Sequence, residues 1–330
     1  MVDAVLDTAP LGAQWPTLDP FLFCAHHNDS YPRANSAYGP AESLRGREIG
    51  SDFAGKDGWN MYHGTTVPGF PAHPHRGFET VTYVRKGVID HSDSLGATAR
   101  FGAGDAQWVT AGRGIVHSEM FPLLDSDAPN PLELFQIWLN LPAADKMVDP
   151  YFTMLWAADL ATRKFGSQMS SVTVTAIAGA IGDAIPPAPP PNSWASHRDA
   201  DVAIWHLVFE PGATWTLPAP QSAATVRTLY CFVGPGLDIN GTGIGSSTAG
   251  VLAPGIPICL TAGLSDRVEC LLLQGRPIGE PVARYGPFVM NDREGVERAF
   301  SDYRRDGFGG WKWRTQDPVH GPDPTRFAHQ

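Results

Sequence analysis

Residues 73–122 read HPHRGFETVTYVRKGVIDHSDSLGATARFGAGDAQWVTAGRGIVHSEMFP, and this stretch decides the fold class. Short runs of β-forming residues, such as FETVTYV at 78–84, alternate with glycine-bearing turns, such as RKG at 85–87. Turn signals that recur about every 8–12 residues are typical of a β-sandwich or a β-barrel. The stretch therefore predicts an all-β domain built from short strands.

The same stretch carries two pairs of side chains that bind metals. It begins with His73 and His75, and it ends with His117 and Glu119. Alternate residues of a strand point to one face, about 6.6–6.8 Å apart along the strand. Two such strands side by side would aim three imidazoles and one carboxylate at one ion. The pattern predicts a metal site, although each pair alone is equally explained by hydrogen-bonded strand side chains.

The chemistry of these four ligands narrows the choice of metal. They contain no thiolate, which disfavours a structural zinc site. Three imidazoles with one carboxylate suit Fe, Mn, Co, Ni or Cu, and we expect one divalent transition ion, with Fe as the first choice. Four protein ligands leave two positions of an octahedral ion open, so we expect chemistry or ligand exchange at the ion rather than a purely structural role.

Composition supports the fold class and excludes several partners. Glycine and proline contribute 35 and 30 of the 330 residues, and charged residues only 18%, as expected for many turns between short apolar strands. The formal net charge of −10 argues against direct nucleic-acid binding and against an anionic membrane surface. No apolar run approaches the ~18 residues of a membrane span.

Four cysteines lie scattered along the chain without a CxxC motif, at Cys24, Cys231, Cys259 and Cys270. We interpret them as reduced thiols rather than as a disulfide framework. The first 20 residues also lack a basic segment followed by an apolar run, which is the pattern of a secretory signal. We therefore expect a cytoplasmic protein.

The chain divides into two β-rich halves. The run IPPAPPP at 185–191 cannot lie inside a sheet, because proline lacks the backbone donor, and it reads as a surface crossing. We expect a first domain over residues 1–170, of which 1–60 form an irregular extension. The second domain covers 171–310, and residues 311–330 form an extended tail.

One helix is expected, over residues 291–306. Asn291 is a good N-cap residue, and Glu294 three positions later completes a capping box. Apolar residues then recur at helical spacing until the glycines at 307–310. The prediction places this helix in the second domain.

Residues 73–122 closely resemble the signature segment of the pirin family in the cupin superfamily. The segment IGEPVARYGPFVMN at 278–291 resembles the C-terminal segment of the same family. The resemblance implies a bicupin, in which two double-stranded β-helix (jelly-roll) barrels pack face to face. It implies a metal in the N-terminal barrel and a metal-free C-terminal barrel.

By the family motif, the metal ligands are His73, His75, His117 and Glu119. Glu79 falls where the general cupin motif often places a carboxylate ligand, and we expect it beside the ligands rather than among them. We expect His91, in a strand between the two pairs, to face solvent. The N-terminal segment differs from that of a typical pirin, since residues 35–56 look like an insertion. The C-terminal tail is also longer than in a typical pirin.

The resemblance implies an oxygenase, because pirin-like cupins resemble quercetin 2,3-dioxygenases, which cleave flavonols with O₂. The expected partners are a small aromatic substrate such as a flavonol, and O₂, with Glu119 as the catalytic group that accepts the flavonol proton. Two alternatives stay open. One is a redox-responsive regulator that binds a protein partner, and the other is a cupin that binds a small molecule without turnover. We expect a monomer.

Overall fold

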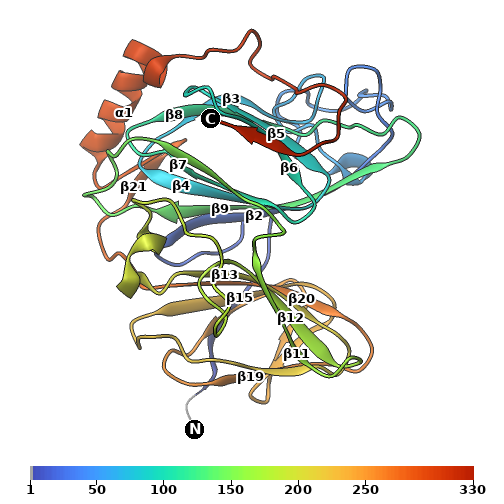
Figure 1. Cartoon of the computed structure of the whole chain (residues 1–330), viewed down its shortest axis with the longest axis vertical. Helices are drawn as coiled ribbons and strands as arrows, with labels where there is room; N and C mark the ends of the chain where they lie inside the picture. The colour runs from blue at the N-terminus through green and yellow to red at the C-terminus, as the bar shows by residue number, and fades with distance from the viewer. Residues whose placement is uncertain (1–2) are drawn as a thin grey trace. The chain divides into compact units, whose positions relative to one another are not determined.

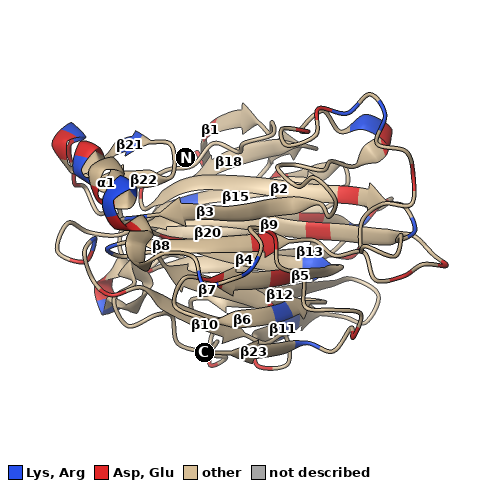
Figure 2. Cartoon of the chain, turned by 90° about the horizontal axis from the view of Figure 1, so that it is seen from above, with Lys and Arg blue, Asp and Glu red and all other residues tan. Residues whose placement is uncertain are grey.

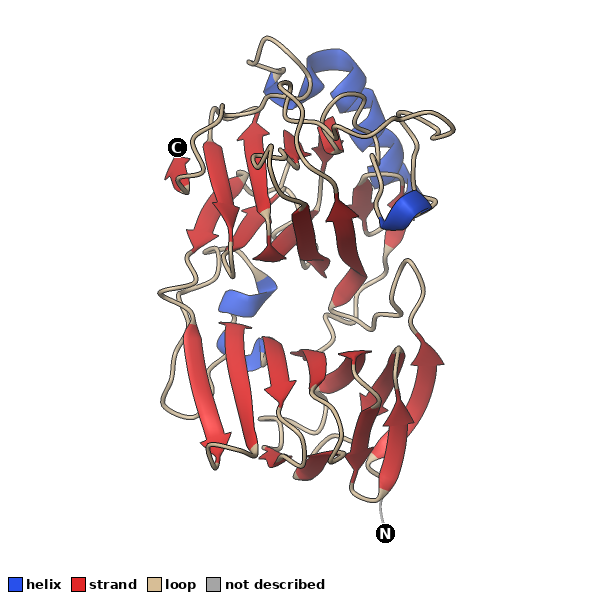
Figure 3. Cartoon of the chain, turned by 90° about the vertical axis from the view of Figure 1, so that its right-hand side faces the viewer, coloured by secondary structure: helices blue, strands red, loops and turns tan. Residues whose placement is uncertain are grey.

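The structure is a computed structural model, and it describes residues 3–330 (Figure 1). Strands make up most of the ordered elements, as Figure 3 shows, and the one α-helix among the described residues is α1 (Arg293–Asp306). No helix in this part of the chain has the length and apolar character needed to span a membrane. The all-β class predicted from the sequence is confirmed.

Two compact units make up the chain. The first barrel comprises residues 26–136, 143–157 and 280–330, and the second barrel comprises the described residues up to 25 together with 137–142 and 158–279.

The first barrel holds two five-stranded sheets. One sheet has the order β23-β6-β5-β8-β3 and the other the order β10-β7-β4-β9-β2. The bounds in the first sheet are β3 (Gly69–His75), β5 (Val88–Asp93), β6 (Thr98–Gly102), β8 (Ile115–Met120) and β23 (Phe327–His329). In the other sheet they are β2 (Phe21–Tyr31), β4 (Phe78–Lys86), β7 (Ala106–Thr110), β9 (Asn130–Asn140) and β10 (Tyr151–Leu155). The short hairpin β21 (Ala283–Tyr285) and β22 (Phe288–Met290) precedes α1.

The second barrel pairs a seven-stranded sheet with a four-stranded one, in the orders β1-β18-β15-β20-β13-β12-β11 and β14-β19-β16-β17. The bounds of the larger sheet are β1 (Val5–Pro10), β11 (Ala161–Gly166), β12 (Ser171–Ala178), β13 (Ala203–Phe209), β15 (Val226–Val233), β18 (Thr248–Leu252) and β20 (Val268–Gly275). The smaller sheet contains β14 (Thr214–Leu217), β16 (Gly236–Ile239), β17 (Thr242–Gly245) and β19 (Ile258–Ala262).

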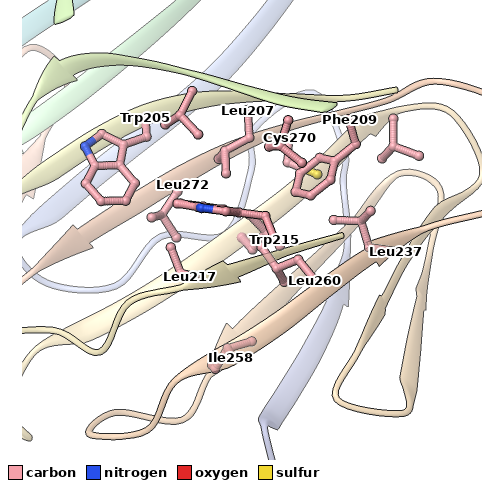
Figure 4. Close-up of a cluster of buried hydrophobic side chains, with 14 of the residues drawn as sticks. Trp205, Leu207, Phe209, Trp215, Leu217, Leu237, Ile258, Leu260, Cys270 and Leu272 are labelled. Carbon is pink, nitrogen blue, oxygen red and sulfur yellow. The ribbon is translucent and has the colours of Figure 1, made fainter. Parts of the chain in front are cut away.

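An apolar cluster fills the second barrel (Figure 4). Trp205, Leu207 and Phe209 alternate along β13 and pack against Trp215 of β14 and Leu272 of β20. Alternation of this kind sends every second side chain of a strand into the core. The apolar interior thus follows directly from the period-2 pattern of the sequence.

The observed division of the chain differs from the contiguous domains 1–170 and 171–310 that we expected. Strand β1 pairs with β18, and β11 pairs with β12, so both belong to the second barrel. Helix α1 belongs to the first barrel, where Phe300 packs on Phe288 of β22 with ring centroids 4.7 Å apart. Pairing between distant strands, which no local pattern encodes, sets these boundaries.

Three local expectations also change. Residues 1–60 are not all irregular, because the described part contains β1 and the 11-residue β2. The helix is capped by Asp292, whose carboxylate accepts the Gly295 N–H at 2.6 Å, while the Asn291 amide donates to Glu280. The tail is extended over most of its length, but its end forms β23 and pairs with β6.

Charged residues are unevenly placed, as Figure 2 shows, with many on α1 and in loops and few on the strands. On α1 they form ion pairs one turn apart, such as Arg293 with Glu297 and Arg298 with Glu294. Exposed pairs of this kind contribute little to stability, roughly 0.3–0.5 kcal/mol each. The strands, in contrast, are held mainly by buried apolar side chains.

Candidate metal centre

The two strands that carry the predicted ligands lie side by side. In the antiparallel pair β3–β8, His73 is the direct partner of His117, and cross-strand partners project from the same face. His75 lies two residues further on, so it shares that face. The nitrogen atoms that the three histidines offer lie within 4.8 Å of one another. The structure thus brings three of the four predicted ligands together.

Burial keeps these histidines neutral. Desolvation lowers the pKa of His73 to about 4, and the hydrogen bond to the Pro71 carbonyl only partly opposes it. Burial likewise holds the pKa of His75 and of His117 well below the usual value for histidine. A neutral imidazole offers the lone pair that a metal needs. The cluster is therefore ready to bind a cation at neutral pH.

The hydrogen bonds of the cluster fit a transition ion. The Nδ1–H of His73 donates to the Pro71 carbonyl at 2.8 Å, which leaves Nε2 as the lone-pair nitrogen. Both ring nitrogens of His117 are buried and lack a hydrogen-bond partner. A buried polar atom without a partner costs about 1–3 kcal/mol. A cation bound between these rings would satisfy one such nitrogen, so the donor set fits the metal that the pirin resemblance implies.

Glu119 lies on the same face of β8 as His117 but is held elsewhere. Gln136 donates to one carboxylate oxygen at 2.8 Å, and Thr82 donates to the other at 2.9 Å. Burial raises the pKa of Glu119, and these hydrogen bonds oppose the rise. Among the described residues, the group whose ligand atoms lie within 4.8 Å contains the three histidines without Glu119.

Glu79 lies on β4, three residues before Thr82, so strand alternation places it on the opposite face from Thr82. Its carboxylate accepts a hydrogen bond from Thr110 at 2.6 Å. Because Thr82 is the β4 residue that reaches Glu119, Glu79 points away from that carboxylate. The structure gives no support to Glu79 as a neighbour of the ligands.

Two further polar residues adjoin the histidines. In the pair β5–β8, His91 is the partner of Glu119 and Asp93 is the partner of His117. The expectation that His91 faces solvent is wrong, because its side chain is fully buried. Its ring lies 5.5 Å from that of His117, and its Nε2 lies 3.3 Å from an oxygen of Asp93. His91 and Asp93 lie two positions apart in the sequence, as the two members of each predicted ligand pair do. This spacing could have identified both residues as neighbours of the site.

A cluster of aromatic side chains lies beside His73, which is the least buried of the three histidines. Phe70 contacts His73 at 6.2 Å between ring centroids and stacks on Tyr62 at 5.1 Å. Phe53, from the predicted insertion, packs edge-on against Tyr62 and His63 and remains 52% exposed. The insertion therefore supplies an exposed apolar surface close to the histidine cluster.

The C-terminal tail braces the strands of the site. The Ala72 N–H, next to His73, donates to the Gln316 carbonyl at 2.6 Å instead of to β8. Strand β3 has a register shift at this point, between Phe70 and His73. The Trp313 indole donates to the Asp93 carbonyl at 2.9 Å. The tail thus holds one ligand strand and the strand of His91 and Asp93.

Two family models match the chain. The model described as Pirin matches residues 6–139, and the model described as Pirin C-terminal cupin domain matches residues 204–309. The chain belongs to the pirin family. The predicted family is confirmed, and the two matches together cover parts of both barrels.

Relatives of this pirin-family chain come from plants, animals and bacteria. Pirin-1 of Arabidopsis thaliana is 35% identical over 249 residues, which cover 73% of this chain and 79% of the relative. Pirin of Homo sapiens is 33% identical over 264 residues, covering 78% and 85%. A Pseudomonas aeruginosa protein, provisionally named a quercetin 2,3-dioxygenase, is 34% identical over 241 residues, covering 73% and 79%.

A solved structure shares the fold. The crystal structure of quercetin 2,3-dioxygenase from Acinetobacter baumannii superposes with a TM-score of 0.73, covering 93% of this chain and 98% of that one. The sequence identity is 24%, so this likeness establishes the two-domain cupin fold and no more. The predicted bicupin class is confirmed by it.

Proposed function

We propose that the first barrel binds one divalent transition ion and that the protein cleaves flavonols with O₂, as a quercetin 2,3-dioxygenase does. The observation that carries the proposal is the convergence of three neutral histidines, of which His117 has no other partner for its nitrogens. The provisional name of the Pseudomonas aeruginosa relative supports the choice of reaction.

His73, His75 and His117 would hold the ion, and Glu119 is proposed as the fourth ligand, as the family motif has it. The donor set favours Fe, with Mn, Ni, Co and Cu as alternatives. When bound, the ion supplies the Lewis acidity that makes a flavonol hydroxyl acidic, together with redox chemistry toward O₂. Two further roles, accepting the flavonol proton and binding its rings, are assigned to side chains of the protein.

Glu119 is proposed to take the flavonol proton. Thr82 and Gln136 hold its carboxylate on the wall formed by β4 and β9, on the same face as His117. A carboxylate fixed in this way can accept the hydroxyl proton of a flavonol that lies against the cluster. Glu119 would act as a metal ligand and as a proton acceptor at different times, because an oxygen that accepts the proton cannot also bind the metal.

The cluster of aromatic side chains beside His73 would bind the flat rings of the substrate. Phe53 and Phe70 offer apolar ring faces, and offset or edge-on contacts between aromatic rings contribute about 0.5–1.5 kcal/mol each beyond area burial. These side chains also exclude water from the histidine cluster on the side where they pack. The insertion at 35–56 would thus set the choice of substrate.

The test compares quercetin turnover with and without O₂. The Fe-loaded protein should consume the flavonol and release CO in air and should do neither under argon. The variant His117→Gln should be inactive, whereas His329→Gln, which changes an exposed histidine of the same barrel, should retain activity. Binding of quercetin without O₂-dependent consumption would refute the oxygenase and favour a binding protein.

Elemental analysis of protein purified without chelators identifies the ion, and one equivalent per chain is the expected result. We also propose a cytoplasmic location. It is supported by the free cysteines at Cys24, Cys231, Cys259 and Cys270, since reduced thiols persist in that compartment. Fractionation of cells that express the chain would test it, and recovery in a secreted fraction would contradict it.

A further inference from the structure

A cavity lies in the second barrel. Its volume is about 660 Å³, within the range of about 300–1,000 Å³ typical of small-molecule sites. One wall is the proline-rich run at 185–189, and another is formed by Trp205 and Pro218. Polar side chains line the rest of the cavity, namely Ser196, His197, Arg198, Asp201, Gln221 and Gln274. The cavity thus combines apolar walls with a group of polar side chains, as ligand sites do.

A buried arginine lies next to this cavity. Arg227 is fully buried, and its single hydrogen bond runs from Nη2 to the Pro218 carbonyl at 2.8 Å. Its Nε and Nη1 have no partner. Burial lowers its pKa to about 10, with the charge of Asp201 opposing this, so the guanidinium stays protonated at neutral pH. A buried charge with so few partners is costly and calls for an anion or water.

Strand register places Arg227 next to residues that line the cavity, although Arg227 itself is not a lining residue. Ala203 is the partner of Gln274 in β13–β20, and Gln274 is the partner of Arg227 in β20–β15. Partners across an antiparallel sheet project from the same face, so these side chains form one row. Ala203 and Gln274 line the cavity, as does Pro218, which accepts the Arg227 hydrogen bond. The guanidinium therefore lies directly behind the cavity wall.

The nearest carboxylate is already engaged. One oxygen of Asp201 accepts from the Gln274 amide at 3.0 Å. The other accepts from the Gln221 N–H at 2.9 Å and from the Thr225 hydroxyl at 2.8 Å. Asp201 moderates the charge of Arg227 from a distance, but these three donors occupy its oxygens. The free N–H groups of Arg227 thus remain available to another anion.

The first barrel shows how this fold satisfies an arginine that is only structural. Arg100 is also fully buried, but its Nε and Nη2 donate to the two oxygens of Asp90 at 2.7 and 2.6 Å. Its Nη1 donates to the Asp323 carbonyl. Every nitrogen of that guanidinium has a partner, whereas two nitrogens of Arg227 have none. The buried Arg47 of the first barrel leaves one nitrogen without a partner, so Arg227, with two, is the least satisfied of the three arginines.

We propose that this cavity binds a small carboxylate with a flat apolar body, whose carboxylate pairs with Arg227 and whose rings lie against Trp205 and the prolines. Hydrogen bonds between guanidinium and carboxylate are the strong, charge-assisted kind. Both free nitrogens are covered by protein atoms, so the proposal includes an outward shift of residues 218–224, most of which are exposed. The inference is independent of the proposed oxygenase activity, because it concerns the other barrel.

Calorimetric titration of the whole protein tests the proposal. The probes are 2-naphthoate, its neutral analogue 2-naphthalenemethanol, and inorganic phosphate. We expect one naphthoate per chain, with at least about tenfold weaker binding of the other two probes, since a charge pair and an apolar wall are each needed. Equal binding of the neutral analogue or of phosphate would overturn the proposed class of ligand.

Variants locate the binding site. Arg227→Met should weaken naphthoate binding at least about tenfold, and it should raise the Tm of the free protein because an unpaired buried charge is removed. Arg227→Lys keeps the charge without the planar fork and should bind more weakly than the natural chain, which carries the test if the methionine variant fails to fold. Arg267→Gln changes a half-exposed arginine of the same barrel outside the cavity and should bind normally. Arg198→Gln tests the other cation, which lies on the cavity rim. Binding that depends on Arg198 and not on Arg227 would refute the assignment.

Discussion

The two barrels have the same architecture but use their interiors differently. In the second barrel, leucine, tryptophan and phenylalanine side chains fill the space between the sheets (Figure 4). In the first barrel, an apolar cluster that includes Ile89, Phe101 and Leu134 occupies only part of the interior, and buried polar residues such as His117 and Glu119 occupy the rest. The first barrel gives up part of its apolar core for a cluster of buried polar side chains. The second barrel keeps a continuous apolar core, and its cavity lies at the edge of that core, where Ala203 and Trp205 belong to both.

The largest expected effect is a loss of stability in the apolar barrel. Leu272 on the central strand β20 is fully buried, so Leu272→Ala should lower the free energy of unfolding by about 2–5 kcal/mol. Urea denaturation measures it. Leu264→Ala makes the same change at a side chain that is 90% exposed and should have an effect within about 0.5 kcal/mol. A loss below about 1 kcal/mol at Leu272 would mean that this interior is not the stabilising core.

The second effect concerns the polar barrel. His117→Gln removes a proposed ligand, and the affinity for the metal should fall by more than about 100-fold, since even residues that only orient ligands are worth about 10–100-fold. In His117→Leu, stability without metal should hold or rise, because an apolar side chain replaces two unpartnered ring nitrogens. Elemental analysis and thermal unfolding measure the two quantities. Full metal content with His117→Gln would show that the cluster is an ordinary set of core histidines.

A smaller effect is expected at His91, which we interpret as a residue that positions His117. His91→Gln should weaken metal binding by about tenfold and change the absorption spectrum of the Co²⁺-loaded protein. His206→Gln is the matched control, because His206 is a buried histidine of the second barrel that pairs with Glu269 at 2.9 Å. Identical affinities and spectra for His91→Gln and the natural chain would remove His91 from the site.

The smallest effect is a dependence on pH in the first barrel. Burial raises the pKa of Glu133, but hydrogen bonds from His26 and Lys86 and the charge of Arg85 outweigh this and lower it from 4.5 to about 2. A depressed carboxyl pKa stabilises the fold above the unfolded-state value and loses that contribution as pH falls toward the folded value. Stability should therefore fall between about pH 4.5 and 2. Glu133→Gln should flatten this part of the stability profile, and an unchanged slope would contradict the assignment.

The sequence predicted what depends on local pattern. Period-2 spacing placed His73, His75 and His117 on strand faces, and the structure brings them together. The same spacing did not predict the burial of His91, because a histidine in a strand can equally lie on an exposed face. The contacts of Glu119 with Thr82 and Gln136 join separate strands, so no spacing within one segment encodes them.

The boundaries of the domains were harder to predict for the same reason. Strand β1 joins the second barrel through β18, more than 200 positions later in the chain, and α1 joins the first. The N-cap also moved by one residue, since Asn291 and Asp292 are both good capping residues and tertiary contacts with Glu280 decide between them. Local chemistry predicted the elements, whereas their partners depend on the whole fold.

The short strand β23 has a consequence for how readily the protein aggregates. It occupies the outer edge of the sheet β23-β6-β5-β8-β3, where its backbone pairs with Arg100, Ala99 and Thr98 of β6. An uncovered edge strand is a template for aggregation. Loss of β23 would therefore leave the outer edge of β6 unpaired, and we expect a chain without this strand to self-associate through β6.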